Sequence, residues 1–139
     1  MTTQKPPPLA QSIQLARAAL DDVDPAAPTA ALPRLRAAAE HVTEAIDEAM
    51  AAVILEEGAT LRSAGALAGL SENAVGPRLA RTRDLGAYSA DSGRVTAKGV
   101  ERALYDLERG SHRPVRAGDP ALARPTMPLR FRARRPAED

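Results

Sequence analysis

The stretch from residue 60 to residue 86 constrains the fold more than any other part of this chain. Apolar residues at helical spacing run up to Gly69, and a Gly-Leu-Ser turn follows them. A second helix is expected from Ser71, whose hydroxyl can accept a hydrogen bond from a first-turn N–H. Val75 and Leu79 would point inward from that helix and its arginines outward. The stretch therefore predicts two short helices joined by a tight turn, the second with a basic face.

Two residues interrupt the second helix, which otherwise extends to Gly86. Pro77 has no N–H to donate to the carbonyl of Asn73, and its ring crowds that turn. Gly76 adds backbone freedom directly before it. We therefore expect this helix to kink, or to split so that a new helix begins at Pro77 and carries Arg78.

The scarcity of aromatic residues favours helices throughout. Aromatic side chains make up 2% of the 139 residues, so the core must be built from Ala, Leu, Val and Ile. These residues suit closely packed helices, whereas a β-sandwich would be enriched in aromatic and β-branched residues. The length predicts one domain with tails. The absence of cysteine excludes disulfides, cysteine-ligated zinc and a thiol nucleophile.

Charge is distributed unevenly along the chain. Residues 1–57 hold 4 basic and 9 acidic side chains, residues 58–110 hold 8 and 6, and residues 111–139 hold 7 and 3. A positive C-terminal half favours a polyanionic partner. The alternative for the tail is that arginine-rich coding bias places arginines in any disordered segment.

The N-terminal part predicts two helices after a disordered segment, residues 1–8. Residues 9–57 hold both: one of about three turns from Leu9, then a linker marked by prolines, then a long helix that starts near Pro33 and ends at Glu57.

The long helix carries a heptad-like row of apolar residues: Leu35, Ala39, Val42, Ile46, Ala49 and Val53. Such a row is typical of a helix that pairs with a second copy of itself, which predicts a homodimer. The alternative is an ordinary amphipathic helix that covers its own domain, and the two alanines weaken the coiled-coil interpretation.

The C-terminal part predicts a small hairpin, a helix and a tail. Residues 87–89 and 94–95 are expected to form short strands around a turn. Thr96 is expected to cap a last helix, Ala97 to Arg109. Residues 111–139 are rich in proline and arginine and are expected to form a disordered basic tail.

Together, these elements place a helix, a helix-turn-helix, a hairpin and a final helix in residues 58–110. The chain here resembles bacterial winged helix-turn-helix transcription regulators, broadly of the MarR or PadR kind. The resemblance rests on Leu67-Ala68-Gly69-Leu70-Ser71, Ala74-Val75, Arg78-Leu79, Leu85-Gly86-Ala87 and Val95-Thr96-Ala97-Lys98-Gly99. It implies a mainly α fold with N-terminal helices and a β-hairpin wing. It also implies sequence-specific binding of double-stranded DNA as a homodimeric transcription regulator.

In the resembled fold the second helix enters the major groove. The candidate base-contacting residues near its start are Glu72, Asn73, Gly76 and Pro77, followed by Arg78, and the capping residue Ser71 is counted with the DNA-binding residues. Asparagine can bond an adenine edge, glutamate can accept from cytosine, and arginine can reach guanine. Arg62, Arg81 and Arg83 are better placed for phosphates. Arg94 and Lys98 would lie on the wing and at its exit.

Two other functions remain open at this point. One is a winged-helix module that binds a protein partner through the acidic long helix or the basic tail. The other is a non-specific nucleoid-type DNA binder. Catalysis is not expected, because His41 and His112 are isolated and no nucleophile–base arrangement or phosphate-binding loop is present. No cofactor, metal or membrane span is expected, and the predicted location is the cytoplasm, on the nucleoid.

Overall fold

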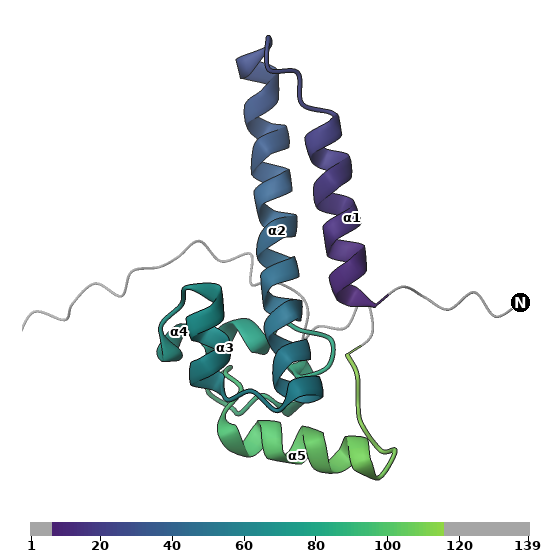
Figure 1. Cartoon of the computed structure of the whole chain (residues 1–139), viewed down its shortest axis with the longest axis vertical. Helices are drawn as coiled ribbons and strands as arrows, with labels where there is room; N and C mark the ends of the chain where they lie inside the picture. The colour runs from purple at the N-terminus through teal and green to yellow at the C-terminus, as the bar shows by residue number, and fades with distance from the viewer. Residues whose placement is uncertain (1–6, 116–139) are drawn as a thin grey trace, which may run out of the picture.

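A helical hairpin projects from a small globular end. The structure is a computed structural model, and it describes residues 7–115. The hairpin consists of α1 (Pro8–Asp21) and α2 (Pro28–Glu57) (Figure 1). The globular end consists of α3 (Leu61–Ala68), α4 (Glu72–Leu79), the 3-10 turn η1 (Gly86–Tyr88) and α5 (Ala97–Glu108). Across the described residues, no helix combines the length and apolar character that a bilayer crossing requires.

The first helix occurs where it was expected, but the start predicted for the second is wrong. α2 begins at Pro28 and continues through Pro33, which lies on its exposed side near its start. Because Pro33 has no N–H, the carbonyl of Thr29 lacks its helical donor. This carbonyl lies near the start of the helix, where water can donate to it instead. The linker between the two helices is therefore only residues 22–27.

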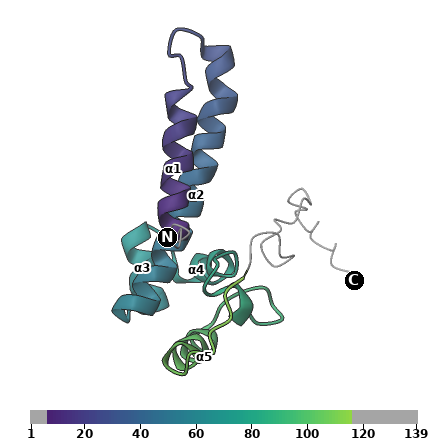
Figure 2. The ribbon, with the colours of Figure 1, turned by 90° about the vertical axis from the view of Figure 1, so that its right-hand side faces the viewer.

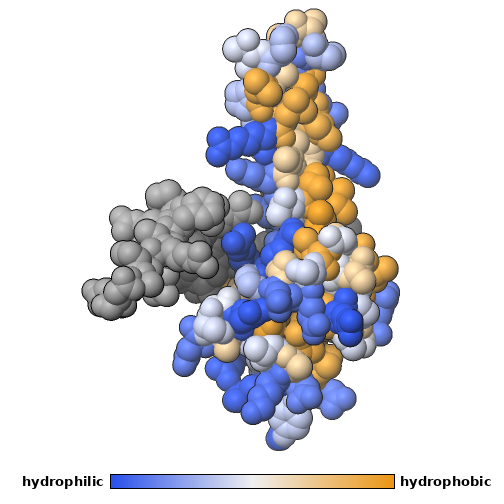
Figure 3. Space-filling model, turned by 90° about the vertical axis from the view of Figure 1, so that its left-hand side faces the viewer, coloured by the Kyte–Doolittle hydropathy of each residue, from blue (hydrophilic) through white to orange (hydrophobic). Residues whose placement is uncertain are grey.

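The hairpin is held together by small side chains. Ala31, Ala38 and Ala45 of α2 are buried at intervals of seven residues, and they face the buried Ser12 and Ala16 of α1. Side chains of this size let two helices approach closely. The larger apolar residues of the hairpin consequently lie outside this contact, and they are visible as a hydrophobic stretch along it (Figure 3).

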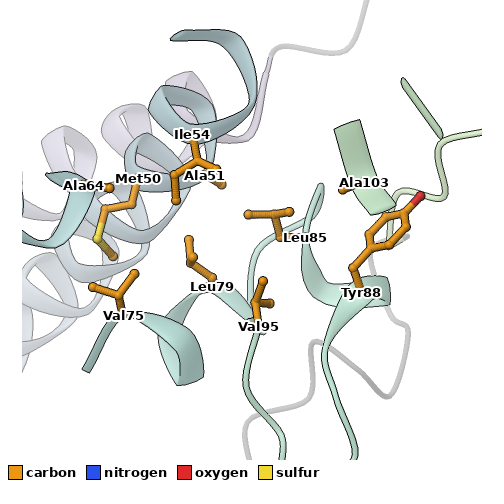
Figure 4. Packing of buried hydrophobic residues seen from close by; sticks show 10 residues of the cluster. All are labelled: Met50, Ala51, Ile54, Ala64, Val75, Leu79, Leu85, Tyr88, Val95 and Ala103. Atoms are coloured by element: carbon orange, nitrogen blue, oxygen red, sulfur yellow. The ribbon is translucent and has the colours of Figure 1, made fainter. Parts of the chain in front are cut away.

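The last turns of α2 enter the core of the globular end, as their apolar character predicts. Figure 4 shows ten buried side chains from all parts of that end: Met50, Ala51, Ile54, Ala64, Val75, Leu79, Leu85, Tyr88, Val95 and Ala103. Nine of them are aliphatic, which agrees with the scarcity of aromatic residues. α2 is thus one helix shared by the hairpin and the core.

Local end signals place α3 where the sequence predicted it. Gly58 ends α2 with φ of 73°. The Thr60 hydroxyl accepts a hydrogen bond from the Ser63 N–H (3.0 Å), and the Ser63 hydroxyl oxygen accepts one from the Thr60 N–H (2.9 Å). This reciprocal capping satisfies two of the free donors at the start of α3. Gly69, with φ of 73°, ends it.

The second short helix is shorter than expected and is not split. α4 runs through Pro77 without a break and ends at Leu79, so Arg81 and Arg83 follow it in turns. The buried Thr82 donates its hydroxyl to the Leu79 carbonyl (2.6 Å), and its N–H bonds the same carbonyl (3.0 Å). The Arg83 N–H, which a longer helix would direct to the Leu79 carbonyl, donates instead to Oε1 of Glu48 (3.1 Å), so the helical hydrogen bonds end at this point.

The expected β-hairpin wing is wrong: between the ends of α4 and α5, the described chain forms turns and η1 and no strand. The expected turn exists, because the Ala90 N–H bonds the Arg94 carbonyl and the Gly93 N–H bonds the Ala90 carbonyl, both at 2.9 Å. However, the N–H of Val95, a residue of the second expected strand, donates to the Gly76 carbonyl on α4 (3.0 Å). Docking on α4 replaces strand pairing, so the part of the chain that the structure describes is mainly α and has no wing.

The end of the described chain packs on the globular end, five residues beyond the boundary predicted for the tail. The His112 ring stacks on Tyr88 with centroids 5.4 Å apart, and the Val115 N–H bonds the Arg83 carbonyl (2.8 Å). The remainder of the predicted tail, residues 116–139, and residues 1–6 of the predicted disordered N-terminus lie outside the described residues. Thr96 precedes α5 as expected but makes no side-chain capping bond.

Candidate nucleic-acid interface

Two glycines define how α3 and α4 meet beside the C-terminal end of α2 (Figure 2). Gly69 turns the chain between the two helices. Gly65 faces α4 so closely that a Cβ on it would lie 2.6 Å from Cγ2 of the buried Val75. Only a residue without a side chain permits this approach. The sequence thus produces a compact helix-turn-helix unit, although Ser71, exposed at the start of α4, makes no side-chain capping bond and that expectation is wrong.

α4 divides its residues between the core and solvent. Val75, Gly76 and Leu79 are buried, whereas Glu72, Asn73 and Pro77 are exposed. Arg81, just beyond the helix, is also exposed. Asn73, Pro77 and Arg81 are spaced four residues apart, so they follow one another along the outer side of α4 and its exit. We refer to these three residues as the outer face of α4.

Arg78 is not on the outer face, contrary to the expectation that it contacts a base. Its Nε donates to Oδ1 of Asp47 on α2 at 2.5 Å, and the two side chains are 22% and 5% exposed. This ion pair connects residues 31 positions apart and fastens α4 to α2. A guanidinium that is neutralised and half-buried is not available to a ligand. Asp47 was not predicted, although a carboxylate three residues before Met50 on the core-facing side of α2 requires a partner.

Gly76 is also removed from the candidate site, because the segment that follows η1 covers it. A Cβ on Gly76 would lie 2.9 Å from the Val95 carbonyl oxygen and 3.2 Å from the Cβ of Arg94. Pro77 leaves the Asn73 carbonyl without its helical donor, and Nη2 of Arg94 donates to that carbonyl (3.0 Å). The Gly-Pro pair therefore admits a neighbouring segment and offers it an acceptor, instead of breaking the helix.

Arg83 holds the exit of α4 against α2. Its backbone N–H donates to Oε1 of Glu48 (3.1 Å), and its side chain pairs with Asp84 (3.3 Å). Burial raises the pKa of Glu48 to about 7, an effect that the Arg83 N–H opposes and the charge of Asp84 reinforces. Asp47 and Glu48, consecutive on α2, thus engage both Arg78 and Arg83.

The raised pKa predicts a pH-dependent stability that Glu48→Gln removes. The folded state binds the Glu48 proton more tightly than the unfolded state, so stability falls as pH rises from about 4.5 toward about 7. A glutamine can still accept from the Arg83 N–H. We expect the melting temperature of Glu48→Gln minus that of the wild type to increase between about pH 5 and about pH 8, as measured by circular dichroism. A difference independent of pH would contradict the pKa shift.

The structure brings Arg94 of the predicted site beside Asn73. Arg62 on α3 and Lys98 in the first turn of α5 are exposed. Within residues 7–115, no carboxylate pairs with Arg62, Arg81, Arg94 or Lys98, in contrast to Arg78 and Arg83. The arrangement can offer one amide side chain and several unneutralised cations to a polyanion. Comparisons of the chain with protein families, with curated proteins and with solved structures gave no match.

Proposed function

We propose that this chain binds double-stranded DNA through the outer face of α4 and regulates transcription. The observation that carries the proposal is a short helix, set by a glycine turn, whose exposed Asn73 has Arg94 beside it and is followed along the outer face by Arg81, and no described carboxylate pairs with either arginine. The corrected site no longer includes Gly76, Arg78 or Arg83. Arg94 retains its charge because its partner is a neutral carbonyl.

The dimensions and chemistry of α4 suit the major groove. An α-helix with its side chains is about 10–12 Å in diameter, which matches the width of the major groove, about 12 Å. An exposed asparagine in the first turn can bond the edge of adenine, and Glu72 beside it can accept from cytosine. Arg81, Arg94 and Lys98 would contact phosphates, which set the position of the helix without reading sequence.

The test measures how binding depends on salt for Arg81→Ala/Lys98→Ala. For a dimer with about three phosphate contacts per chain, the logarithm of the association constant plotted against the logarithm of the salt concentration should have a slope near −5. Removing two contacts per chain should make that slope shallower, about −2. Fluorescence anisotropy with a DNA duplex selected from a random pool provides the measurement. Both residues are exposed, so the variant should keep its helical circular dichroism spectrum.

Two controls accompany this variant. Arg17→Ala removes an exposed charge from α1 and should leave the slope unchanged. Asn73→Ala removes no charge and should leave the slope unchanged while altering the selected sequence. A slope in the double variant equal to that of the wild type would refute this interface. A random-pool selection without any consensus would instead point to the non-specific nucleoid-type binder.

A further inference from the structure

An apolar strip, with Arg17 at its edge on α1, runs along one side of the hairpin. We define the apolar strip as Leu32, Leu35, Ala39, Val42, Ile46, Ala49 and Val53 of α2 together with Ile13 and Leu20 of α1. Leu32 is 68% exposed, and Leu35, Val42, Ile13 and Leu20 are exposed as well. A helical hairpin that buries alanines and presents leucines to solvent has its larger apolar surface on the outside. Contiguous exposed surface of this kind marks an interaction site.

The α1 and α2 parts of the strip lie on the same side of the hairpin. Ile13 directly follows the buried Ser12, and Leu32 directly follows the buried Ala31. Each step along a helix turns by 100°, and in two antiparallel helices the same step from the contact line leads to the same side. The strip is therefore about two helices wide near the tip of the hairpin.

The other end of the strip opens into a hollow between α2 and α3. The hollow has a volume of about 200 Å³, and its lining is apolar: Ile46, Ala49, Met50, Val53, Ala64, Leu67 and Ala68. Leu67 at its rim is 78% exposed. Figure 3 shows hydrophobic side chains on the hairpin and again beside the globular end, with hydrophilic side chains around them. One strip thus carries protruding leucines at one end and a hollow at the other.

We infer that the strip is the interface with a second copy of this chain, the two α2 helices running antiparallel about a two-fold axis between Ala39 and Val42. In this register Leu35 of one copy lies opposite Ile46 of the other. Leu32 lies opposite Ala49 and enters the hollow beside Leu67. The symmetry repeats each contact, so both leucine ends and both hollows are filled.

Three features favour a second copy as the occupant. Only an antiparallel copy supplies a leucine end for each hollow. From Leu32 to Val53 the strip is about 32 Å long, and it is about 20 Å wide along the 14 residues of α1 and about 10 Å wide beyond them, so two copies would bury on the order of 1,000 Å², which reaches the size of a specific interface. Residues 1–57 carry 4 basic and 9 acidic side chains, which disfavours a nucleic acid or an anionic membrane at this end.

The same charges distinguish the two possible directions of pairing. Asp21, Asp22 and Asp24 are exposed at the tip of the hairpin. A parallel pair would place both sets of carboxylates side by side, and like charges at that range repel. An antiparallel pair separates them by most of the length of α2.

Sedimentation of the full chain tests the interface. The wild type should sediment with twice the 14.6 kDa mass of one chain. Val42→Glu places two carboxylates near the two-fold axis and should weaken dimerisation by about 100-fold or more. Val42 is exposed in the single chain, so the variant should retain its helical spectrum. Ala18→Glu, at an exposed position of α1 on the side away from the strip, is the matched control and should remain a dimer.

Cross-linking tests the direction, because the natural chain has no cysteine. With a short bis-maleimide, Ala39→Cys should cross-link to its own copy, since it lies next to the axis. Leu32→Cys should not, because its two copies are 17 residues, or about 26 Å, apart along the helices. A cross-link in Leu32→Cys would overturn the antiparallel register. A wild type that is monomeric at about 100 μM, about where a weak dimer would already be populated, or a dimeric Val42→Glu, would overturn the interface. None of these outcomes depends on whether α4 binds DNA.

Discussion

Replacing Asp47 by alanine should lower the free energy of unfolding by about 3 kcal/mol. The carboxylate is 5% exposed and pairs with Arg78, so its removal leaves a half-buried guanidinium without this partner. The free energy of unfolding should fall by an amount at the lower end of the range for a broken buried pair, because Arg78 retains some contact with water. Urea denaturation followed by circular dichroism measures the change.

A surface pair supplies the control for this variant. Arg36 and Glu40 lie one helical turn apart on α2 at 3.8 Å, and both are exposed. Glu40→Ala should therefore change the free energy of unfolding by no more than about 0.5 kcal/mol. If Asp47→Ala were as mild as Glu40→Ala, the Asp47–Arg78 pair would not hold α4 to α2. A loss of DNA binding in Arg78→Ala would, by the same reasoning, report unfolding and not a lost base contact.

The second large effect is expected at Gly99, in the first turn of α5. A Cβ there would lie 2.5 Å from the carbonyl oxygen of Tyr88, a backbone atom that a rotamer change cannot move away. Tyr88 is anchored in turn, since its hydroxyl donates to Asp106 (2.8 Å) and accepts from the Arg113 N–H (3.0 Å). Gly99→Ala should lower the free energy of unfolding by about 2 kcal/mol, after the gain of up to about 1 kcal/mol from placing alanine in a helix.

Lys98→Ala is the matched control for Gly99→Ala, because it changes the preceding, exposed residue of the same helix. We expect its free energy of unfolding to stay within about 0.5 kcal/mol of the wild type. An increase in stability for Gly99→Ala would show that α5 can move away from Tyr88 at little cost, and would contradict the close packing of α5 on η1.

Elements that are set by their own residues could be predicted from the sequence. α3 begins after Thr60 and ends at Gly69 because a capping box and a left-handed glycine act within a few residues. α4 ends early for a different reason, since Thr82 and Glu48 take the groups that a longer helix would use. The prediction of a wing was wrong for a similar reason, because the Val95 N–H donates to a carbonyl on α4 and not to a neighbouring strand.

The candidate site shows the same division between local and distant causes. The exposure of Asn73, Pro77 and Arg81 follows from the apolar pattern of α4 and was predictable. That Arg78 is withdrawn from the exposed face was not predictable, because its partner Asp47 lies 31 residues away on another helix. Arg94 was expected on a wing, and its position beside Asn73 depends on the carbonyl that Pro77 leaves open.

Because α2 is continuous, it couples the hairpin mechanically to the globular end. Thirty residues of helix form a rod of about 45 Å, with one end in the hairpin and the other in the core. Asp47 and Glu48 attach that rod to Arg78 at the end of α4 and to Arg83 at its exit. A rotation of the hairpin about its own long axis would therefore turn the outer face of α4 with it.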